Sequence, residues 1–398
     1  MAPNVVTVTF DPGLYTNATS PSATTLLGDL ESFDDVITTT SWWSAVTKDY
    51  CDPKQGCIGA GTAGAHVAIS TAPAGDGTAA CGPQPCYTDS SLGGPSSLQT
   101  YLGGLFSSGA LPAPNAHSLF VFYLPESVTI DLDGALSCVV FGGYHGSVQV
   151  AGLDVPYAIV PMCDPQETAQ GIAKLTLEQT ATLAASHEIV EAVTDPHAAE
   201  VPPGTSQNST QGLAWYLTDD ASAAWTLPAG GEIADLCVDI LGLGQDRWTE
   251  SGYVVQRVWS NSSAAAKDDP CVPTPSGEVY FNAGPSTVAS DQLTLAVGKS
   301  GSIQVDAFAD GTMPAWKVLA VDIGTDANGN PANVLSLSPG EASPALASGG
   351  ATIPLSVTLT ADPPAQAAGT VGYEPYLIVS VASATSAHYW PAVVLVGH

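Results

Sequence analysis

The amino-acid composition of the sequence changes near residues 271–277, where Cys-Val-Pro-Thr-Pro-Ser-Gly indicates a linker. Beyond it, short runs rich in Val, Ile and Leu are separated by Gly, Pro, Asp and Asn, without a helical pattern of useful length. Strands at this spacing favour a β-sandwich of immunoglobulin-like size. The expected strands are Gln292–Val297, Ser302–Phe308, Trp316–Asp322, Thr352–Thr360, Tyr376–Ala382 and Pro391–Val396.

The 398 residues are too many for one ordinary core, so we expect two domains. Residues 1–272 have a mixed pattern that predicts an α+β fold, and residues 273–398 form the accessory all-β sandwich. Residues 51–95 are rich in Gly, Pro, Thr and Cys and should form loops. The expected strands of the first domain are Val5–Phe10, Ser118–Leu124, Ser137–Phe141 and Tyr157–Val160, and its shorter helices are Leu26–Val36, Trp42–Tyr50 and Ser97–Phe106.

The longest expected helix begins at a capping box, in which Thr176 is followed three residues later by Gln179. It should end near Thr194, because Asp195-Pro196 disfavours a further helical turn.

The chain has eight cysteines, and their positions suggest four local pairs. Disulfides form in oxidising compartments, so we expect a secreted, extracellular protein. No apolar run approaches the roughly 20 residues that are needed to cross a bilayer. The expected pairs are Cys51 with Cys57, Cys81 with Cys86, Cys138 with Cys163, and Cys237 with Cys271.

The charge balance is strongly acidic, with 38 Asp and Glu against eight Lys and Arg and a net charge of -30. Nucleic-acid binders need basic side chains to neutralise phosphates, and anionic membranes repel such a surface. We therefore expect no nucleic-acid and no membrane partner. In acid the carboxylates become neutral and few basic residues remain to repel one another, so adaptation to low pH is a further hypothesis.

The candidate chemistry lies in the longest helix, which contains His187-Glu188-Ile189-Val190-Glu191. His187 and Glu191 are four residues apart, so their side chains can converge on one ion, and Glu188 can reach a water beside it. This is the pattern of the His-Glu-x-x-His metallopeptidase helix, with a glutamate in place of the second histidine. The flanking residues are small and apolar, and burying these groups without a cation is costly. The alternative is a structural histidine on an ordinary helix.

A third ligand is expected in Gly-Glu-Ile-Ala-Asp-Leu-Cys, which starts at residue 231. Asp235 or Glu232 would bind the metal, and the other would act from the second shell. We favour Asp235 because the neighbouring Cys237 would fix its backbone. An acidic surface turn is the alternative.

Other residues rank lower. His145 could stabilise a transition state or could be a turn histidine, and Tyr216 and Tyr144 could donate to an oxyanion or pack as aromatics. Asp195 more often ends a helix before proline than binds a metal.

Several segments together resemble a family of secreted bacterial and fungal proteins related to the plant exordium (phosphate-induced) proteins. The resemblance covers roughly residues 115–272, in the right order. It implies a zincin-like domain, in which the helix supplies two ligands and the catalytic base, and the Glu232/Asp235 pair completes the site. The matching segments are Phe141–Gly146, Ala158–Cys163, Ser186–Pro196, Trp215-Tyr216, Glu232–Cys237 and Trp259–Asn261.

These patterns predict a secreted Zn²⁺-dependent metallopeptidase that hydrolyses a peptide or protein substrate. A metal-activated water attacks, Glu188 is the general base, and His145 or Tyr216 stabilises the oxyanion. One alternative is a non-catalytic extracellular binding protein (of cell wall or carbohydrate) with a structural metal. In either case the C-terminal domain could contact cell wall or polysaccharide, or serve as a spacer. A glycoside hydrolase with paired carboxylates is another alternative, but it leaves His187 unexplained.

Overall fold

A computed structural model describes residues 2–19, 21–52, 56–77, 81, 84–90, 96–165, 174–196, 232–287, 292–325, 330–364 and 372–397. The chain forms two compact units, the first from Met1–Tyr216 with Gly244–Trp259 and the second from Leu217–Leu243 with Ser260–His398. The domain boundary expected after residue 272 stays a prediction. Within the described ranges, no helix is both long and apolar enough to cross a membrane.

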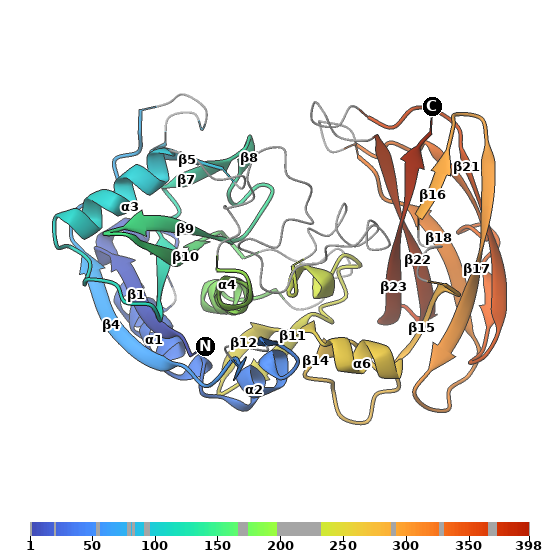
Figure 1. Ribbon diagram of the computed structural model, residues 1–398, viewed down its shortest axis with the longest axis horizontal. Helices are drawn as coiled ribbons and strands as arrows, with labels where there is room; N and C mark the ends of the chain where they lie inside the picture. The colour runs from blue at the N-terminus through green and yellow to red at the C-terminus, as the bar shows by residue number, and fades with distance from the viewer. Residues whose placement is uncertain are drawn as a thin grey trace. The chain divides into compact units, whose positions relative to one another are not determined.

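The first unit is built on a five-stranded sheet in the order β4 (Thr62–Ile69), β1 (Asn4–Phe10), β6 (Ser118–Leu124), β10 (Leu153–Pro161) and β9 (Tyr144–Val150) (Figure 1). The first four strands are parallel to one another, and β9 is antiparallel to β10. Strand β6 is buried along its whole length, which fits its nearly continuous apolar sequence and its central place in the sheet.

Three helices pack around this sheet: α1 (Ala23–Ile37), α3 (Ser97–Ser107) and α4 (Leu177–Thr194). The Tyr123 hydroxyl of β6 donates to Asp34 Oδ1 of α1 at 2.9 Å, whereas the Phe120 ring packs edge-on against Phe106 of α3. Residues 120 and 123 of a strand point to opposite faces, so α1 and α3 cover opposite sides of the sheet. Helix α4 contacts α1 and β10 and therefore lies on the α1 side.

Smaller elements complete the first unit. The hairpin formed by β11 (Arg247–Glu250) and β12 (Tyr253–Gln256) packs on α4 through β12. The remaining elements are η1 (Pro12–Leu14), α2 (Ser41–Thr47), β2 (Cys51–Asp52), β3 (Gly56–Cys57), β5 (Cys86–Asp89), β7 (Thr129–Leu132), β8 (Ala135–Leu136) and β13 (Val258–Trp259).

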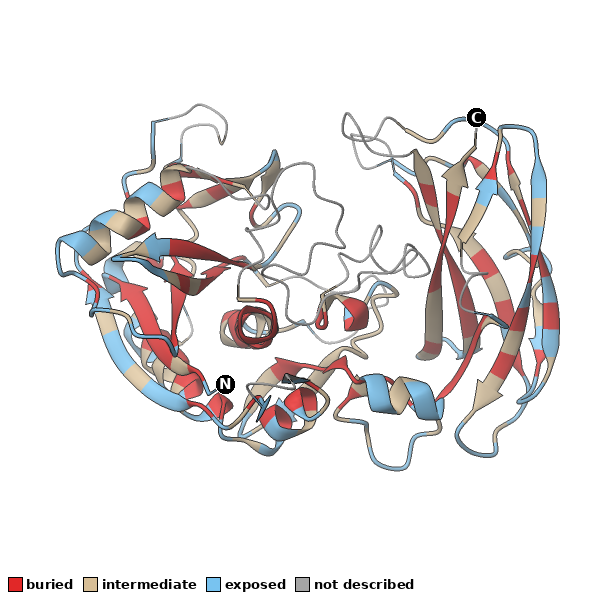
Figure 2. Cartoon of the chain, viewed as in Figure 1, coloured by how far each residue is buried: buried red, intermediate tan, exposed pale blue. Residues whose placement is uncertain are grey.

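The second unit contains two sheets that share one apolar core. One has the order β15 (Phe281–Pro285), β17 (Ser300–Ala309), β21 (Thr352–Leu359) and β19 (Leu335–Ser338). The other has the order β16 (Gln292–Leu295), β23 (Ser386–Val396), β22 (Tyr373–Ser383), β18 (Trp316–Asp322) and β20 (Ala345–Ala347). In β21, buried and more exposed residues alternate, and Figure 2 shows such changes of burial along the strands. The unit also includes η4 (Asp235–Cys237), α6 (Asn261–Ala266) and β14 (Cys271–Val272).

The described fold is therefore mixed α and β, followed by an all-β region, as expected. All six strands predicted after residue 291 are present to within a few residues. The four disulfides are also confirmed, and they are consistent with an oxidising compartment. The pairs are Cys51–Cys57, Cys81–Cys86, Cys138–Cys163 and Cys237–Cys271.

Two expectations for the first unit were wrong. Residues 51–95 are not only loops, because they contain β5 and the sheet strand β4. The run 137–141 is not a strand: Cys138 has a left-handed φ of 62°, and the Val139 and Val140 side chains are 78% and 69% exposed. The strand that precedes β10 is instead β9, which starts at Tyr144.

Candidate metal centre

Helix α4 is held in a buried position, as Figure 2 shows by its red residues. The capping box is present, with Thr176 and Gln179 exchanging hydrogen bonds at its N-terminus. Asp195 is the C-cap, which confirms that it ends the helix before the proline. Every residue from 188 to 195 is buried, because the sheet, α1 and the β11–β12 hairpin surround this end of the helix.

His187 and Glu191 converge as their spacing predicts. His187 Nε2 lies 2.9 Å from Glu191 Oε2, and the Glu191 side chain is only 1% exposed. Glu188 is also buried. Burial raises the pKa of Glu188 above its usual range, although the neighbouring His187 and His145 oppose that shift.

His145 extends from strand β9 of the sheet towards the same two carboxylates, those of Glu188 and Glu191. It pairs with Ala158 in the β9–β10 register, and its Nδ1 lies 3.6 Å from Glu188 Oε2 and 3.7 Å from Glu191 Oε2. Ligand atoms of these three side chains all lie within 4.8 Å of one another. The neighbouring Tyr144 points to the other face, where its hydroxyl donates to Asp89 Oδ2 at 2.7 Å, so it packs away from the carboxylates.

The hydrogen-bond partners fix which histidine nitrogens carry protons. His187 Nδ1 lies 2.9 Å from the Gln256 side-chain oxygen, which can only accept, so Nδ1 carries hydrogen and Nε2 presents a lone pair to Glu191. His145 Nε2 lies 3.2 Å from the Asp195 carbonyl oxygen and must also donate. The Nδ1 atom of His145 therefore faces two carboxylates with either a lone pair or a second proton.

Gly143 places backbone directly against Glu188. A Cβ atom at this position would lie 2.7 Å from Glu188 Oε1 and 2.9 Å from its Cγ, closer than real side chains approach. Gly143 thus allows the loop before β9 to cover the Glu188 carboxyl group.

The donor set fits a divalent cation. Two buried carboxylates and two imidazoles converge, and His187 Nε2 and Glu191 Oε2 are both acceptors at 2.9 Å unless a proton or a metal ion joins them. Nitrogen and carboxylate oxygen are ligands that zinc accepts. The set does not fix the identity of the metal, because Mn²⁺ accepts the same atoms.

The remaining predicted residues lie in other parts of the chain. Glu232 and Asp235 belong to the second unit, where Asp235 opens η4 and both are partly buried. The disulfide Cys237–Cys271 anchors that segment, as expected, but the ligand role of either acid stays a prediction. Tyr216 lies outside the described residues.

The sequence did not indicate Gln256 or Gly143 as site residues. Gln256 ends β12, and its backbone N–H donates to Ser186 Oγ at 2.8 Å, next to the histidine that its side chain orients. No local pattern marks a glutamine for this contact, because it depends on how the hairpin packs on α4.

Comparisons with known proteins give no family. No family model matches the chain, and no curated protein matches it. A solved structure described as the periplasmic chaperone SfaE aligns at 8% identity with a TM-score of 0.20. That alignment covers 30% of this chain and 56% of the chaperone chain, and a likeness this weak carries no argument.

Proposed function

We propose that the protein is a zinc-dependent metallopeptidase, with a zincin-like first unit and its metal on α4. The observation that carries the proposal is the contact between His187 Nε2 and Glu191 Oε2 at 2.9 Å inside a buried cluster. Gln256 turns the lone pair of Nε2 towards that carboxylate. Such an orientation is what a metal-ligating histidine needs from its outer partner.

His187 and Glu191 would hold the ion, and the sequence pattern favours Asp235 or Glu232 as the third ligand. When bound, zinc acts as a Lewis acid that polarises a carbonyl group and lowers the pKa of water. The His145–Glu188–Glu191 group could also hold an ion, and the variants His145→Ala and His187→Ala separate these two positions.

Glu188 would be the general base. Glu188 directly follows the proposed ligand His187 in the sequence, and its carboxylate faces the buried cluster rather than the solvent. It would take a proton from the attacking water and later transfer it to the leaving nitrogen of the peptide. With its second proton, His145 would hold the Glu188 carboxylate and stabilise the oxyanion that develops.

The test compares the purified protein with Glu188→Gln. We expect one zinc per chain by elemental analysis in both proteins, and cleavage of a broad peptide library that falls by about 10²–10⁴-fold in the variant. Glu178→Gln is the matched control, because it makes the same change in the first turn of α4 and should cleave like the wild type.

Each contrary result has a distinct meaning. Metal in both proteins without cleavage by either would favour a non-catalytic protein with a structural site. Absence of any bound metal after purification with added zinc would overturn the proposal.

A further inference from the structure

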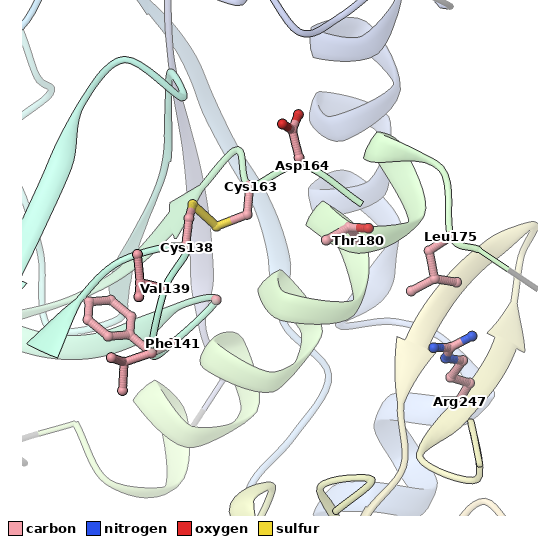
Figure 3. A pocket seen from close by; sticks show the side chains of 10 residues that line it. Cys138, Val139, Phe141, Cys163, Asp164, Leu175, Thr180 and Arg247 are labelled. Carbon is pink, nitrogen blue, oxygen red and sulfur yellow. A yellow bond between two sulfur atoms is a disulfide. The ribbon is translucent and has the colours of Figure 1, made fainter. Parts of the chain in front are cut away.

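A pocket of about 340 Å³ lies in the first unit beside the N-terminal half of α4 (Figure 3). This volume is in the range of small-ligand sites. Its walls include Phe141 and Leu175, Thr180 of α4, and Arg247 at the start of β11.

One wall is a loop that is covalently fixed. The disulfide Cys138–Cys163 ties the loop to the end of β10, as Figure 3 shows by its yellow bond. Between this anchor and β9, the loop exposes Val139 by 78% and Val140 by 69%, and both line the pocket. Two adjacent exposed valines on this anchored loop offer an apolar contact surface to a ligand in the pocket.

The same loop joins the pocket to the metal centre. It continues through Gly142, which lines the pocket, to Gly143, which lies against Glu188. Helix α4 makes the second connection, because Thr180 lines the pocket and Glu188 lies eight residues later, about 12 Å along the axis. A ligand in the pocket would therefore extend towards the catalytic carboxyl group.

Arg247 gives the pocket its chemical preference. The chain has only eight basic residues, and this one lines the hollow near the N-terminal turn of α4, where the helix dipole is also positive. Its Nε lies 3.7 Å from Asp246 Oδ1, and a guanidinium can engage more than one carboxylate. Asp164, the other charged group of the lining, lies 3.3 Å from the side-chain nitrogen of Asn17.

We infer that this pocket is a substrate subsite, which binds an apolar residue together with a carboxylate held by Arg247. The inference rests on the proposed peptidase function. An extended peptide advances about 3.3–3.6 Å per residue, so the bound residue would lie roughly three or four residues from the scissile bond. The carboxylate is either the C-terminus of the peptide or an Asp or Glu side chain near that residue.

Binding is measured with the full chain carrying Glu188→Gln, so that no probe is cleaved. The probe is an N-terminally fluorescein-labelled Ala-Ala-Ala-Ala-Leu peptide, either with a free C-terminus or as the amide. We expect the free acid to bind about tenfold more tightly at 0.15 M salt. The net charge of -30 repels acidic peptides in general, so such a preference must come from a local group.

Adding Arg247→Gln should remove most of this tenfold preference, whereas Lys317→Gln, an equal change of charge on β18, should leave it intact. Val140→Ser should weaken the acid and the amide alike. A third probe, the amide with Glu before the Leu, separates the two sources. If it binds like the free acid, a side-chain carboxylate suffices, and if it binds like the amide, the subsite selects the C-terminus.

Equal binding of acid and amide by the protein with intact Arg247, or a preference that survives Arg247→Gln, would overturn the inference. This assay needs neither metal nor turnover. A protein that shows the Arg247-dependent preference but cleaves nothing would therefore retain the subsite and lose the proposed peptidase function.

Discussion

His145 Nδ1 lies 3.7 Å from Glu191 Oε2, and this contact joins an edge strand of the sheet to the helix that carries the metal-binding pattern. It depends on the register of β9 against β10, in which His145 pairs with Ala158. A slip of one residue would turn His145 to the opposite face, where Tyr144 now points. The centre is therefore built on packed secondary structure rather than on loops alone.

Gln256 should determine zinc affinity without touching the metal. Gln256→Leu removes the acceptor that keeps the proton on His187 Nδ1, so we expect the zinc dissociation constant to rise about 10–100-fold in competition with a chelator. Gln256→Glu keeps an acceptor and should retain wild-type affinity or bind more tightly. Both variants keep the backbone bond to Ser186, which makes them a matched pair. Equal affinity of the two would show that this contact has no part in the site.

His145 should affect turnover rather than metal content. His145→Ala removes the imidazole that lies 3.6 Å from Glu188 and would face the developing charge, so kcat should fall about 10²–10³-fold with one zinc still bound. His187→Ala is the comparison, because it should lose the metal altogether. Loss of zinc from His145→Ala would instead show that the ion occupies the His145–Glu188–Glu191 group.

Local signals made much of the fold predictable. The capping box of α4 and the apolar run of β6 each depend on residues that are close together in the sequence, and both elements were found where they were expected. The convergence of His187 and Glu191 follows in the same way from helical periodicity. In the second unit, short runs of β-branched residues between turn residues were sufficient to identify the main strands.

Features that depend on tertiary packing were not predictable. Strand β4 has small and largely exposed residues, and it becomes a strand by pairing with β1. The apolar pair Val139-Val140 led to a wrong prediction of a strand, because both side chains are in fact exposed on the disulfide-anchored loop. The Gln256–His187 contact joins elements that are distant in sequence, so no spacing rule could indicate it.

Gly143 should be required for the position of Glu188. In Gly143→Ala, the added Cβ atom would meet the Glu188 carboxyl group at 2.7 Å, so the base must move and kcat should fall at least about tenfold. Zinc content should not change, because the metal ligands are not displaced. Gly28→Ala on α1 is the control, since a Cβ there would meet no neighbouring atom within 4 Å, and its activity should match that of the wild type. Similar activity of both variants would contradict this role.

Asp34 should make the first unit more stable in acid. Burial raises the pKa of Asp34 from 3.8 to about 7, although hydrogen bonds from Thr7 and Tyr123 favour the charged form. Between these values the folded state binds a proton that the unfolded state lacks. The stabilisation is therefore complete below pH 4 and is lost as the pH rises to about 7. The free energy of unfolding falls by about 1.4 kcal/mol for each pH unit in this range, which amounts to a few kcal/mol in all.

Asp34→Asn removes this titration while keeping the shape of the side chain. Chemical denaturation at pH 4, 5, 6 and 7 should show that the unfolding free energy of the wild type falls relative to that of the variant as the pH rises. Asp362→Asn, at an exposed position, should keep the wild-type pH dependence. Parallel curves for the wild type and Asp34→Asn would mean that Asp34 does not hold its proton near neutral pH. The acid-adaptation hypothesis would then rest on the surface charge alone.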